Sequence, residues 1–433
     1  MKNKKVAIIG NMNNNGFSLL RYLRDHGVET DLLLYSNDGK GSLSHFVPEN
    51  DTWSIKKFKK YIHQTNIPND VIVALDGLFG FITASLICLK SLLRNRKKSF
   101  IWLSKNELKR NLGCYDFYIG SGIAPAVFDR LGKTLDIFFP YATGVEFLEA
   151  QEFTCRLPQM NWFLRCVHQK AKNNQANGLR KTKNILNGEL SFTASILNQY
   201  GLKFIPLTIP LFYVETLPSS EEASSRILSI AKRKIASRPY IFQCSRQYWI
   251  NKKKIPSHKW FRESKNSDWV INAFARYIDI FPARNEMLVL TEYGPDIDES
   301  KALVQNLDIN ERVIWLEKMG RREIIEIARS SELILGEFIL DNEAIWGGTG
   351  WEALALGKPL IHSFKFAEGR FEELYGYPEP PILKANSEDE ILDAISRLLS
   401  DPNLSRDIGT IGRRWFHEHN GSGLTQKWMQ FLT

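Results

Sequence analysis

Residues 346–361 read WGGTGWEALALGKPLI, which predicts a glycine-rich loop, a short helix, a Gly-Lys-Pro turn and the start of a buried strand. Gly347, Gly348 and Gly350 let backbone N–H groups approach a ligand closely, because glycine has no Cβ. The helix that follows directs its unpaired N–H groups and the positive end of its dipole at this loop. The stretch therefore predicts an anion site, and phosphate is the usual anion. Glu352 falls in the first helical turn, where its carboxylate can reach a hydroxyl-bearing ligand.

The glycines by themselves fit an ordinary surface turn equally well, because short glycine motifs recur by chance. The whole stretch, however, resembles the C-terminal signature of retaining glycosyltransferases of family 4. In that family a glycine loop precedes Glu-Ala, a small residue and Gly-x-Pro-hydrophobic. The resemblance implies the GT-B fold, an α/β architecture of two Rossmann-like domains that face each other across a cleft.

Outward from this stretch, the second half of the chain alternates short apolar runs with amphipathic segments, which is typical of α/β domains. Ser387 is the expected N-cap of a late helix, with Glu390 completing a capping box. The expected strands are 238–244, 286–290, 313–315, 333–335 and 360–361, and the expected helices are 267–281, 321–328, 387–399 and 425–432.

The first half shows the same alternation. Residues 5–10, 17–26 and 30–35 form a predicted strand–helix–strand unit, hence a parallel sheet with ligands at the carboxyl ends of its strands. Its first loop is not GxGxxG, so an ordinary dinucleotide site is not expected. Further strands are expected at 71–75, 99–103, 117–119, 135–138 and 203–206, and further helices at 160–173 and 190–199.

Prolines and serines between residues 206 and 220 indicate a linker. We expect an N-terminal, acceptor-binding domain at 1–212, the linker at 213–225 and a nucleotide-sugar-binding domain at 226–420. The resemblance further implies that the last segment, 421–433, is a helix that packs back on the N-terminal domain.

The resemblance also implies which residues bind the donor. Arg246 follows a strand and Lys265 precedes a helix, as do the cations that clamp the donor diphosphate in family 4. Glu352 matches the second glutamate of the family's paired motif, which binds ribose hydroxyls. The first glutamate of that pair would stand at Ala344, so the sugar-contacting carboxylate is expected from Glu337 or Glu343 instead.

Several further residues complete the predicted donor site. Thr349 lies within the glycine loop, and the backbone of Met319, after the strand at 313–315, could read the edge of the nucleotide base. Gly16, in the loop after the first strand, would face the donor phosphates or the acceptor. No histidine or cysteine spacing indicates a metal, so no metal and no cofactor besides the nucleotide-diphosphate sugar are expected.

The bulk properties limit the partners. The net charge of +9 and the isoelectric point near 9.1 favour an acidic partner: a nucleotide, a nucleic acid or an anionic membrane. Five scattered cysteines and the short apolar run near Met1 favour a cytoplasmic protein with free thiols. The apolar run from Leu78 to Leu93, followed by Arg94-Asn95-Arg96-Lys97-Lys98, predicts a mostly buried helix or, alternatively, a helix at a membrane surface.

Together these features predict a metal-independent glycosyltransferase that moves a sugar from a nucleotide-diphosphate donor to a glycan or lipid-linked acceptor. Surface-polysaccharide or glycoconjugate synthesis, on the inner face of the cytoplasmic membrane, is the expected setting, and no specific nucleic acid is expected. Two alternatives remain open: a sugar-nucleotide epimerase with the same fold, and an inactive sugar-nucleotide-binding protein.

Overall fold

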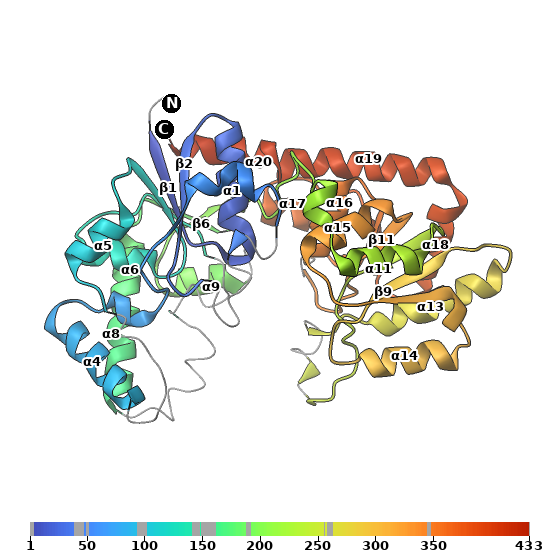
Figure 1. Cartoon of the computed structure of the whole chain (residues 1–433), viewed down its shortest axis with the longest axis horizontal. Coiled ribbons are helices and arrows are strands. Elements are labelled where there is room, and N and C mark those ends of the chain that lie inside the picture. Colours follow the sequence, from blue (N-terminus) through green and yellow to red (C-terminus); the bar gives the residue numbers. More distant parts are fainter. Residues whose placement is uncertain are drawn as a thin grey trace. The chain divides into compact units, whose positions relative to one another are not determined.

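The computed structural model divides the chain into two compact α/β units (Figure 1). Unit 1 comprises residues 1–50, 55–213 and 424–433, and unit 2 comprises residues 51–54 and 214–423. The structure describes residues 4–38, 47–48, 52–92, 102–140, 148, 162–187, 192–254, 256–257, 263–343 and 348–432. The main chain passes from unit 1 to unit 2 after Tyr213, at the start of the segment expected to be a linker.

Within the described residues, unit 1 holds a parallel sheet in the order β3-β2-β1-β4-β5-β6-β7. On β1, Ala7 and Ile9 join one apolar cluster, whereas Val6 and Ile8 join another, because alternate side chains of a strand point to opposite faces. Both faces of the sheet are therefore buried. The strands are β1 Lys5–Ile9, β2 Glu29–Leu34, β3 Ile62–Gln64, β4 Phe117–Gly120, β5 Ile137–Phe138, β6 Asn184–Asn187 and β7 Ile205–Pro206.

Helices from both ends of the chain cover one face of this sheet. α1 (Asn15–Asp25) and α20 (Ser422–Met429) supply side chains to the same apolar cluster, and the indole of Trp428 donates to the Thr208 carbonyl at 2.7 Å. The cluster on the other face includes residues of α6, α8 and α9. The other helices of unit 1 are η1 Met12–Asn14, α3 Ile55–Phe58, η3 Lys59–Tyr61, η4 Val71–Ala74, α4 Gly77–Leu92, α5 Lys105–Leu112, α6 Ala124–Arg130, α8 Trp162–Lys181, α9 Phe192–Gln199 and η7 Gln430–Leu432.

Unit 2 repeats this plan with the strand order β10-β9-β8-β11-β12-β13, again all parallel. The chain order reverses between β8 and β11, and open α/β sheets bind ligands beside such a switch point, at the carboxyl ends of the strands. The strands are β8 Tyr240–Gln243, β9 Met287–Thr291, β10 Val313–Leu316, β11 Leu333–Leu335, β12 Leu360–His362 and β13 Leu383–Lys384.

The helices of unit 2 form two groups. α13 and α18 pack on each other and share one apolar cluster with the strands, while α11, α15, α16 and α19 pack in series. Their bounds are α10 Ser220–Ala223, α11 Arg226–Ile235, α13 Ser267–Ile280, α14 Ile297–Asn306, η6 Asn310–Arg312, α15 Arg321–Ser330, α16 Gly348–Leu356, α17 Arg370–Tyr375, α18 Glu388–Ser400 and α19 Pro402–His419.

The strand expected at 71–75 is wrong. Val71–Ala74 form the 3₁₀ helix η4, because the Asp70 carboxylate accepts from the Ile72 N–H and caps a helical turn. The strand expected at 99–103 is also wrong for Trp102 and Leu103, since β4 pairs directly with β1, and residues 99–101 lie outside the described residues. The capping box expected at Ser387 is half formed: its hydroxyl accepts from the Glu390 N–H, but the Glu390 carboxylate accepts from the Asn386 N–H.

The expectation of a mostly buried helix at 78–93 is also wrong. α4 rests on the protein through its small residues, among them Gly80, Thr83 and Ala84, because a Cβ on Gly80 would lie 2.6 Å from the Leu75 carbonyl oxygen. Its large apolar side chains point outward. Among the described residues, no helix is both long and apolar enough to cross a membrane.

Candidate functional site

The candidate site lies at the switch point of unit 2, where β8 and β11 end. The Gly336 carbonyl, just after β11, accepts from the Gln243 amide at 3.1 Å and from the Ser245 hydroxyl at 3.2 Å. These bonds join the ends of the two central strands. The His362 ring packs against Gly336 so closely that a Cβ there would lie 2.0 Å from it, and burial lowers the pKa of His362 to about 4. His362 is therefore a neutral, structural ring at physiological pH.

Lys265 and Glu337 form the first ion pair of the site. The Lys265 Nζ lies 2.8 Å from Glu337 Oε2, and both side chains are largely buried. Two main-chain contacts fix this pair: the Lys265 N–H donates to the Tyr248 carbonyl, and the Phe338 N–H donates to the Lys265 carbonyl. A cation held in this way beside the carboxyl ends of the strands can neutralise a phosphate.

Asn266 forms the turn between Lys265 and α13. Its φ of 41° is left-handed, a conformation that asparagine adopts more readily than most residues. Its amide donates to the Phe338 carbonyl at 2.6 Å and its carbonyl oxygen accepts from the Ser264 hydroxyl. The turn before α13 therefore keeps its shape, and Lys265 keeps its position.

Arg321 and Glu352 form the second ion pair. The Arg321 Nε, at the start of α15, lies 2.8 Å from Glu352 Oε1 on α16, and the Glu352 side chain is mostly buried. Gly348 begins α16 beside them: a Cβ placed on it would lie 3.7 Å from an Arg321 nitrogen and 4.0 Å from the Glu352 carboxylate. The N-terminus of α16 therefore adjoins a guanidinium, which suits an anion.

Cys244, directly after β8, lies near a glutamate of each ion pair. Its sulfur is 3.4 Å from the Thr349 hydroxyl of α16. Burial, followed by the charges of Glu352 and Glu337, raises the pKa of the Cys244 thiol to about 12. The thiol is therefore neutral, and the two carboxylates are near enough to it to belong to one site.

The loop after β8 carries Arg246, whose side chain is exposed and whose carbonyl accepts from the Ser267 hydroxyl at 3.1 Å. Asp296, wholly buried, holds this loop by accepting from the Trp249 and Ile250 N–H groups at 2.8 Å each. Gly294 allows the close approach, since a Cβ there would lie 2.4 Å from the Gln247 carbonyl oxygen. Arg246 is thus an accessible cation on a loop with a fixed main chain.

The two candidates for the missing glutamate lie in different surroundings. Glu337 pairs with Lys265 at the sheet edge, whereas Glu343 pairs with Arg370 of α17 at 3.0 Å and its N–H donates to the Lys365 carbonyl. Only Glu337 acts on the Cys244 thiol together with Glu352. Gly347 lies outside the described residues, and Gly350 is buried in the first turn of α16.

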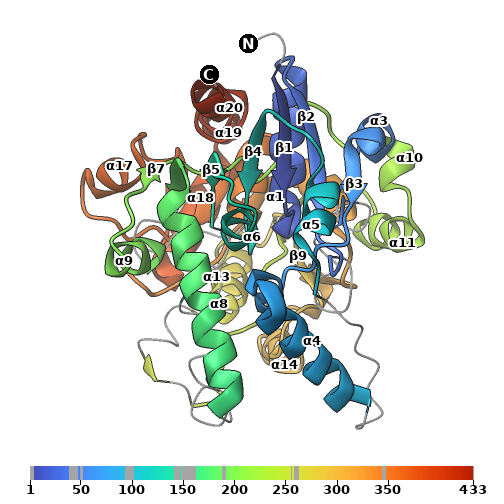
Figure 2. The same ribbon diagram turned by 90° about the vertical axis from the view of Figure 1, so that its left-hand side faces the viewer.

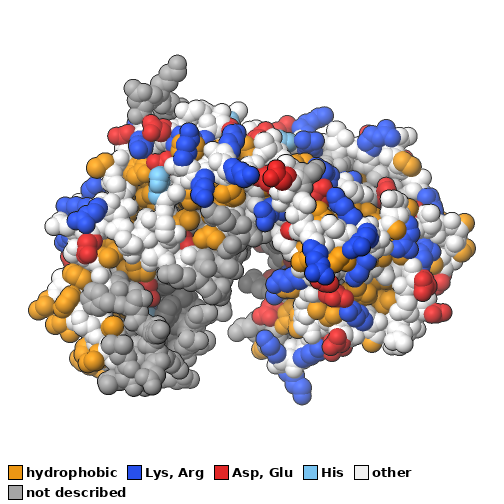
Figure 3. Space-filling view, viewed as in Figure 1, with side chains coloured by type: hydrophobic (Ala, Val, Ile, Leu, Met, Phe, Trp, Pro, Cys, Tyr) orange, Lys and Arg blue, Asp and Glu red, His pale blue; other side chains and the backbone are white. Residues whose placement is uncertain are grey.

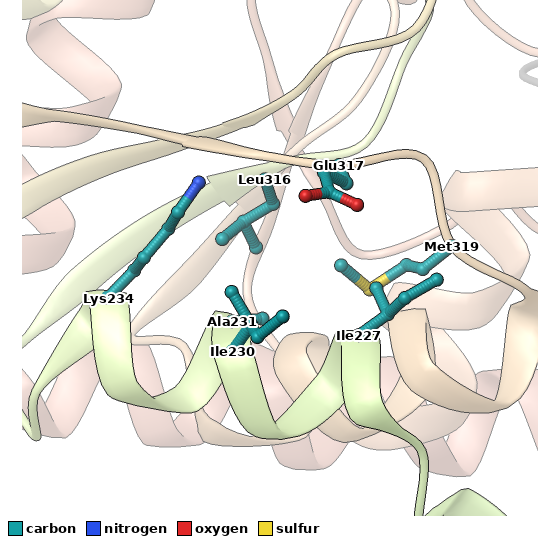
Figure 4. A pocket seen from close by; sticks show the side chains of 7 residues that line it. All are labelled: Ile227, Ile230, Ala231, Lys234, Leu316, Glu317 and Met319. Atoms are coloured by element: carbon teal, nitrogen blue, oxygen red, sulfur yellow. The ribbon is translucent and has the colours of Figure 1, made fainter.

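Met319 directs its side chain toward α11, where it lines a small pocket with Ile227, Ile230 and Leu316 (Figure 4). The pocket holds about 10 Å³, roughly enough for one water molecule. A contact of Met319 with a nucleotide base would therefore involve its backbone.

Gly16 lies in unit 1, and its lack of a side chain has a packing reason. A Cβ on Gly16 would lie 2.4 Å from the Gly10 carbonyl oxygen, so only glycine lets α1 sit this close to the end of β1. Asn11 caps the same turn by accepting from the Phe17 N–H at 2.8 Å. The contact of Gly16 with phosphates or acceptor stays a prediction.

The sequence prediction missed Arg321 and Asp296. Arg321 opens an ordinary amphipathic helix, and Asp296 follows a turn, so neither stands in a motif. The local sequence signal that could have indicated Asp296 is the Gly294-Pro295 turn directly before it.

Part of unit 2 is similar to known proteins in sequence. Residues 249–415 match the family model described as "Glycosyl transferases group 1". The chain is 28% identical over 179 residues to N-acetyl-alpha-D-glucosaminyl L-malate synthase of Bacillus anthracis, a match that covers 41% of this chain and 44% of that protein. The match thus spans less than half of the curated relative.

Solved structures share the fold over the whole chain. A glycosyltransferase from Rickettsia africae aligns with a TM-score of 0.52 at 14% identity, covering 100% of this chain and 99% of that one. A UDP-N-acetylglucosamine 2-epimerase aligns with a TM-score of 0.53 at 12% identity, covering 100% and 96%. The chain thus has the GT-B fold, with two parallel-sheet units, and residues 249–415 of unit 2 are similar to the glycosyl transferases of group 1.

Proposed function

We propose that this protein transfers a sugar from a nucleotide-diphosphate donor to a glycan or lipid-linked acceptor, with retention of anomeric configuration and without a metal. One observation carries the proposal: two ion pairs, Lys265–Glu337 and Arg321–Glu352, flank the start of α16 inside the region that matches the family model. The site thus joins cations for a diphosphate to carboxylates for hydroxyl groups.

In this proposal, the residues of the site either stabilise the charge of the leaving diphosphate or hold the donor in position. Breaking the bond between the anomeric carbon and the donor oxygen leaves negative charge on the diphosphate, which Lys265, Arg246 and the α16 N-terminus stabilise. Glu352 binds ribose hydroxyls while Arg321 holds one of its oxygens. The acceptor hydroxyl oxygen forms the new bond and its proton passes to the departing diphosphate, so atoms and charge balance.

In the structure, Lys265 pairs with Glu337. A bound diphosphate would draw on the same ammonium group, and Glu337 would then be available to hydroxyls of the donor sugar. Glu343 is the alternative sugar contact, although its pairing with Arg370 favours Glu337. We further propose that the protein acts in surface-polysaccharide or glycoconjugate synthesis, on the cytoplasmic side and in contact with an anionic membrane.

Calorimetric titration with UDP, GDP and ADP tests the donor site. We expect one nucleotide to bind with a roughly micromolar Kd, and Glu352→Ala, Arg246→Ala and Arg321→Ala each to weaken it by about tenfold or more. Arg321→Lys should recover part of the loss. Arg397→Ala, an exposed cation of α18 that pairs with Asp393, is the matched control and should bind normally.

Turnover of the nucleotide sugar then separates the alternatives. A transferase releases nucleoside diphosphate in proportion to glycosylated acceptor, an epimerase interconverts the sugar without that product, and an inactive binder does neither. If none of the three nucleotides binds, the proposed function is overturned, and the glycine loop is a structural turn.

A further inference from the structure

We infer that α4 is a membrane-docking helix, which inserts its outward apolar side chains between the lipids of an anionic bilayer surface. The inference adds a specific element to the proposed function, since a lipid-linked acceptor would be met at that surface. It depends on unit 1 alone, whereas the donor site lies in unit 2.

The distribution of side-chain size on α4 is the reverse of that on a buried helix. Its protein-facing residues are small, as Gly80, Thr83 and Ala84 show, and Trp102 packs beneath them by donating to the Leu75 carbonyl. Its large apolar side chains are between 41% and 73% exposed: Leu78, Phe79, Phe81, Ile82, Leu86 and Leu89.

This arrangement forms a continuous apolar surface rather than scattered single residues. Leu78, Ile82, Leu86 and Leu89 recur at helical spacing, so they line one side of the helix. Hydrophobic side chains gather at the edge of unit 1 where α4 lies (Figure 3). Apolar patches of this kind mark interaction sites, and α4, at about 24 Å long, suits a helix lying in the plane of a membrane interface.

The charged residues of α4, α8 and their flanking sequence indicate what kind of surface binds there. Between Asp76 and Glu107 the sequence has no acid, and it has the cations Lys90, Arg94, Arg96, Lys97, Lys98 and Lys105, of which Lys105 pairs with Asp76 at 2.9 Å. α8 also carries cations and no acid, and it packs on η4 as α4 does. Both helices project toward the same side of unit 1 (Figure 2).

The start of α8 exposes side chains that also suit a membrane surface. Trp162 is 78% exposed, and Arg165 and Lys170 are exposed as well. Tryptophan and cations are the residues that settle at the headgroup level of a bilayer, where each Lys or Arg near anionic lipid adds to the attraction. An apolar helix face, in a stretch whose sequence has cations and no acid between Asp76 and Glu107, fits an anionic lipid surface better than it fits a second copy of this basic chain.

Vesicle co-sedimentation tests the inference. We expect the full chain to bind vesicles of phosphatidylcholine and phosphatidylglycerol at about three to one, and to bind pure phosphatidylcholine several-fold less. The double substitution Leu78→Glu and Leu86→Glu should reduce binding by about tenfold or more, because it places charges on the inserted face. The matched control is Ile280→Glu with Ile411→Glu, two similarly exposed apolar positions of unit 2, which should bind like the wild type.

Circular dichroism and thermal unfolding serve as the control that both double variants are folded. If the wild type does not bind the anionic vesicles, or if the α4 variant binds as well as the wild type, the inference is overturned. It is also overturned if sedimentation equilibrium shows that the wild type is an oligomer which the α4 substitutions dissociate, because α4 is then a contact between copies. Nucleotide titration of the same variants should be normal, so failure of vesicle binding and failure of the proposed function are distinguishable.

Discussion

At the scale of single residues, Glu337 and Glu343 have different ion-pair partners. This difference predicts which of the two carboxylates binds the donor sugar. We expect Glu337→Gln to reduce sugar transfer by about a hundredfold, the usual effect of removing one polar group from a transition-state contact. Binding of the nucleoside diphosphate should hold or tighten, since Lys265 loses its competitor. Steady-state kinetics beside calorimetry separates these two effects.

Glu343→Gln is the matched control, because it removes the same charge from a carboxylate that pairs with Arg370. Transfer should change by less than about threefold. Equal losses from both substitutions would mean that the pairing with Lys265 does not identify the sugar contact.

Asp38 predicts a pH dependence in unit 1. Burial raises the pKa of its carboxyl from 3.8 to about 7, against a smaller lowering by the Tyr35 N–H. Because the folded-state pKa lies above the unfolded one, the proton that Asp38 binds stabilises the fold fully below about pH 4. This contribution is lost as the pH rises to about 7.

Asp38→Asn keeps an oxygen for the Tyr35 N–H and removes the titration. We expect its Tm, relative to the wild type, to rise by about 2–4 °C or more between about pH 4.5 and pH 8. The measured quantity is the change with pH of the Tm difference between the variant and the wild type. An effect of the amide group that does not depend on pH therefore cancels. A difference that stays flat across this range would show that Asp38 does not titrate there.

Single residues also show how far the sequence could predict the site. Glu352, Lys265 and Arg246 stand in motifs, and the structure places the first two in ion pairs at one sheet edge. Arg321 could not be predicted, because only the packing of α15 beside α16 brings its guanidinium to Glu352. Asn266 has the left-handed conformation that glycine adopts most readily, which its side chain does not by itself predict.

At the scale of elements, a glycine lies at each end of α16, and the two differ in the space around them. A Cβ on Gly409 of α19 would lie 2.2 Å from the Gly357 carbonyl oxygen at the end of α16, whereas Gly348 at its start has room. We expect Gly409→Ala to destabilise the protein by about 1–3 kcal/mol, since a backbone carbonyl cannot move aside.

Gly348→Ala should leave the stability unchanged and still weaken nucleotide binding, if the bare backbone there serves the ligand. Thermal unfolding and calorimetry on both variants give the comparison. Loss of stability without loss of binding at Gly348 would assign that glycine to the fold alone.

Elements also separate what composition can predict from what it cannot. Five of the six described strands of unit 2 lie where buried apolar runs predicted them, with ends shifted by at most two residues, whereas β13 was not predicted. Val71–Ala74 has the composition of a strand, but Asp70 caps a helical turn there. For α4, the sequence predicted the helix and not its orientation, because an apolar run does not record which side of it meets the protein.

At the scale of the whole molecule, the chain has separate apolar clusters in its two units, so unfolding should occur in two steps. The helix α20 belongs to unit 1: Trp428 is fully buried there and contacts the Phe139 ring edge-on at 6.0 Å. Trp428→Ala should therefore destabilise unit 1 by about 3–5 kcal/mol, although it lies near the end of the chain that follows unit 2 in sequence.

Scanning calorimetry with and without the bound nucleotide tests this division. Saturating nucleotide should raise the transition of unit 2, which holds every residue of the proposed donor site except Gly16, because a ligand stabilises the unit that binds it. Trp428→Ala should lower the other transition, and Trp415→Ala in α19, which stacks on Trp351, should lower the ligand-sensitive one. If both tryptophan variants moved a single transition together, the two units would unfold as one body, and the ligand would then stabilise the docking helix of unit 1 as well as its own site.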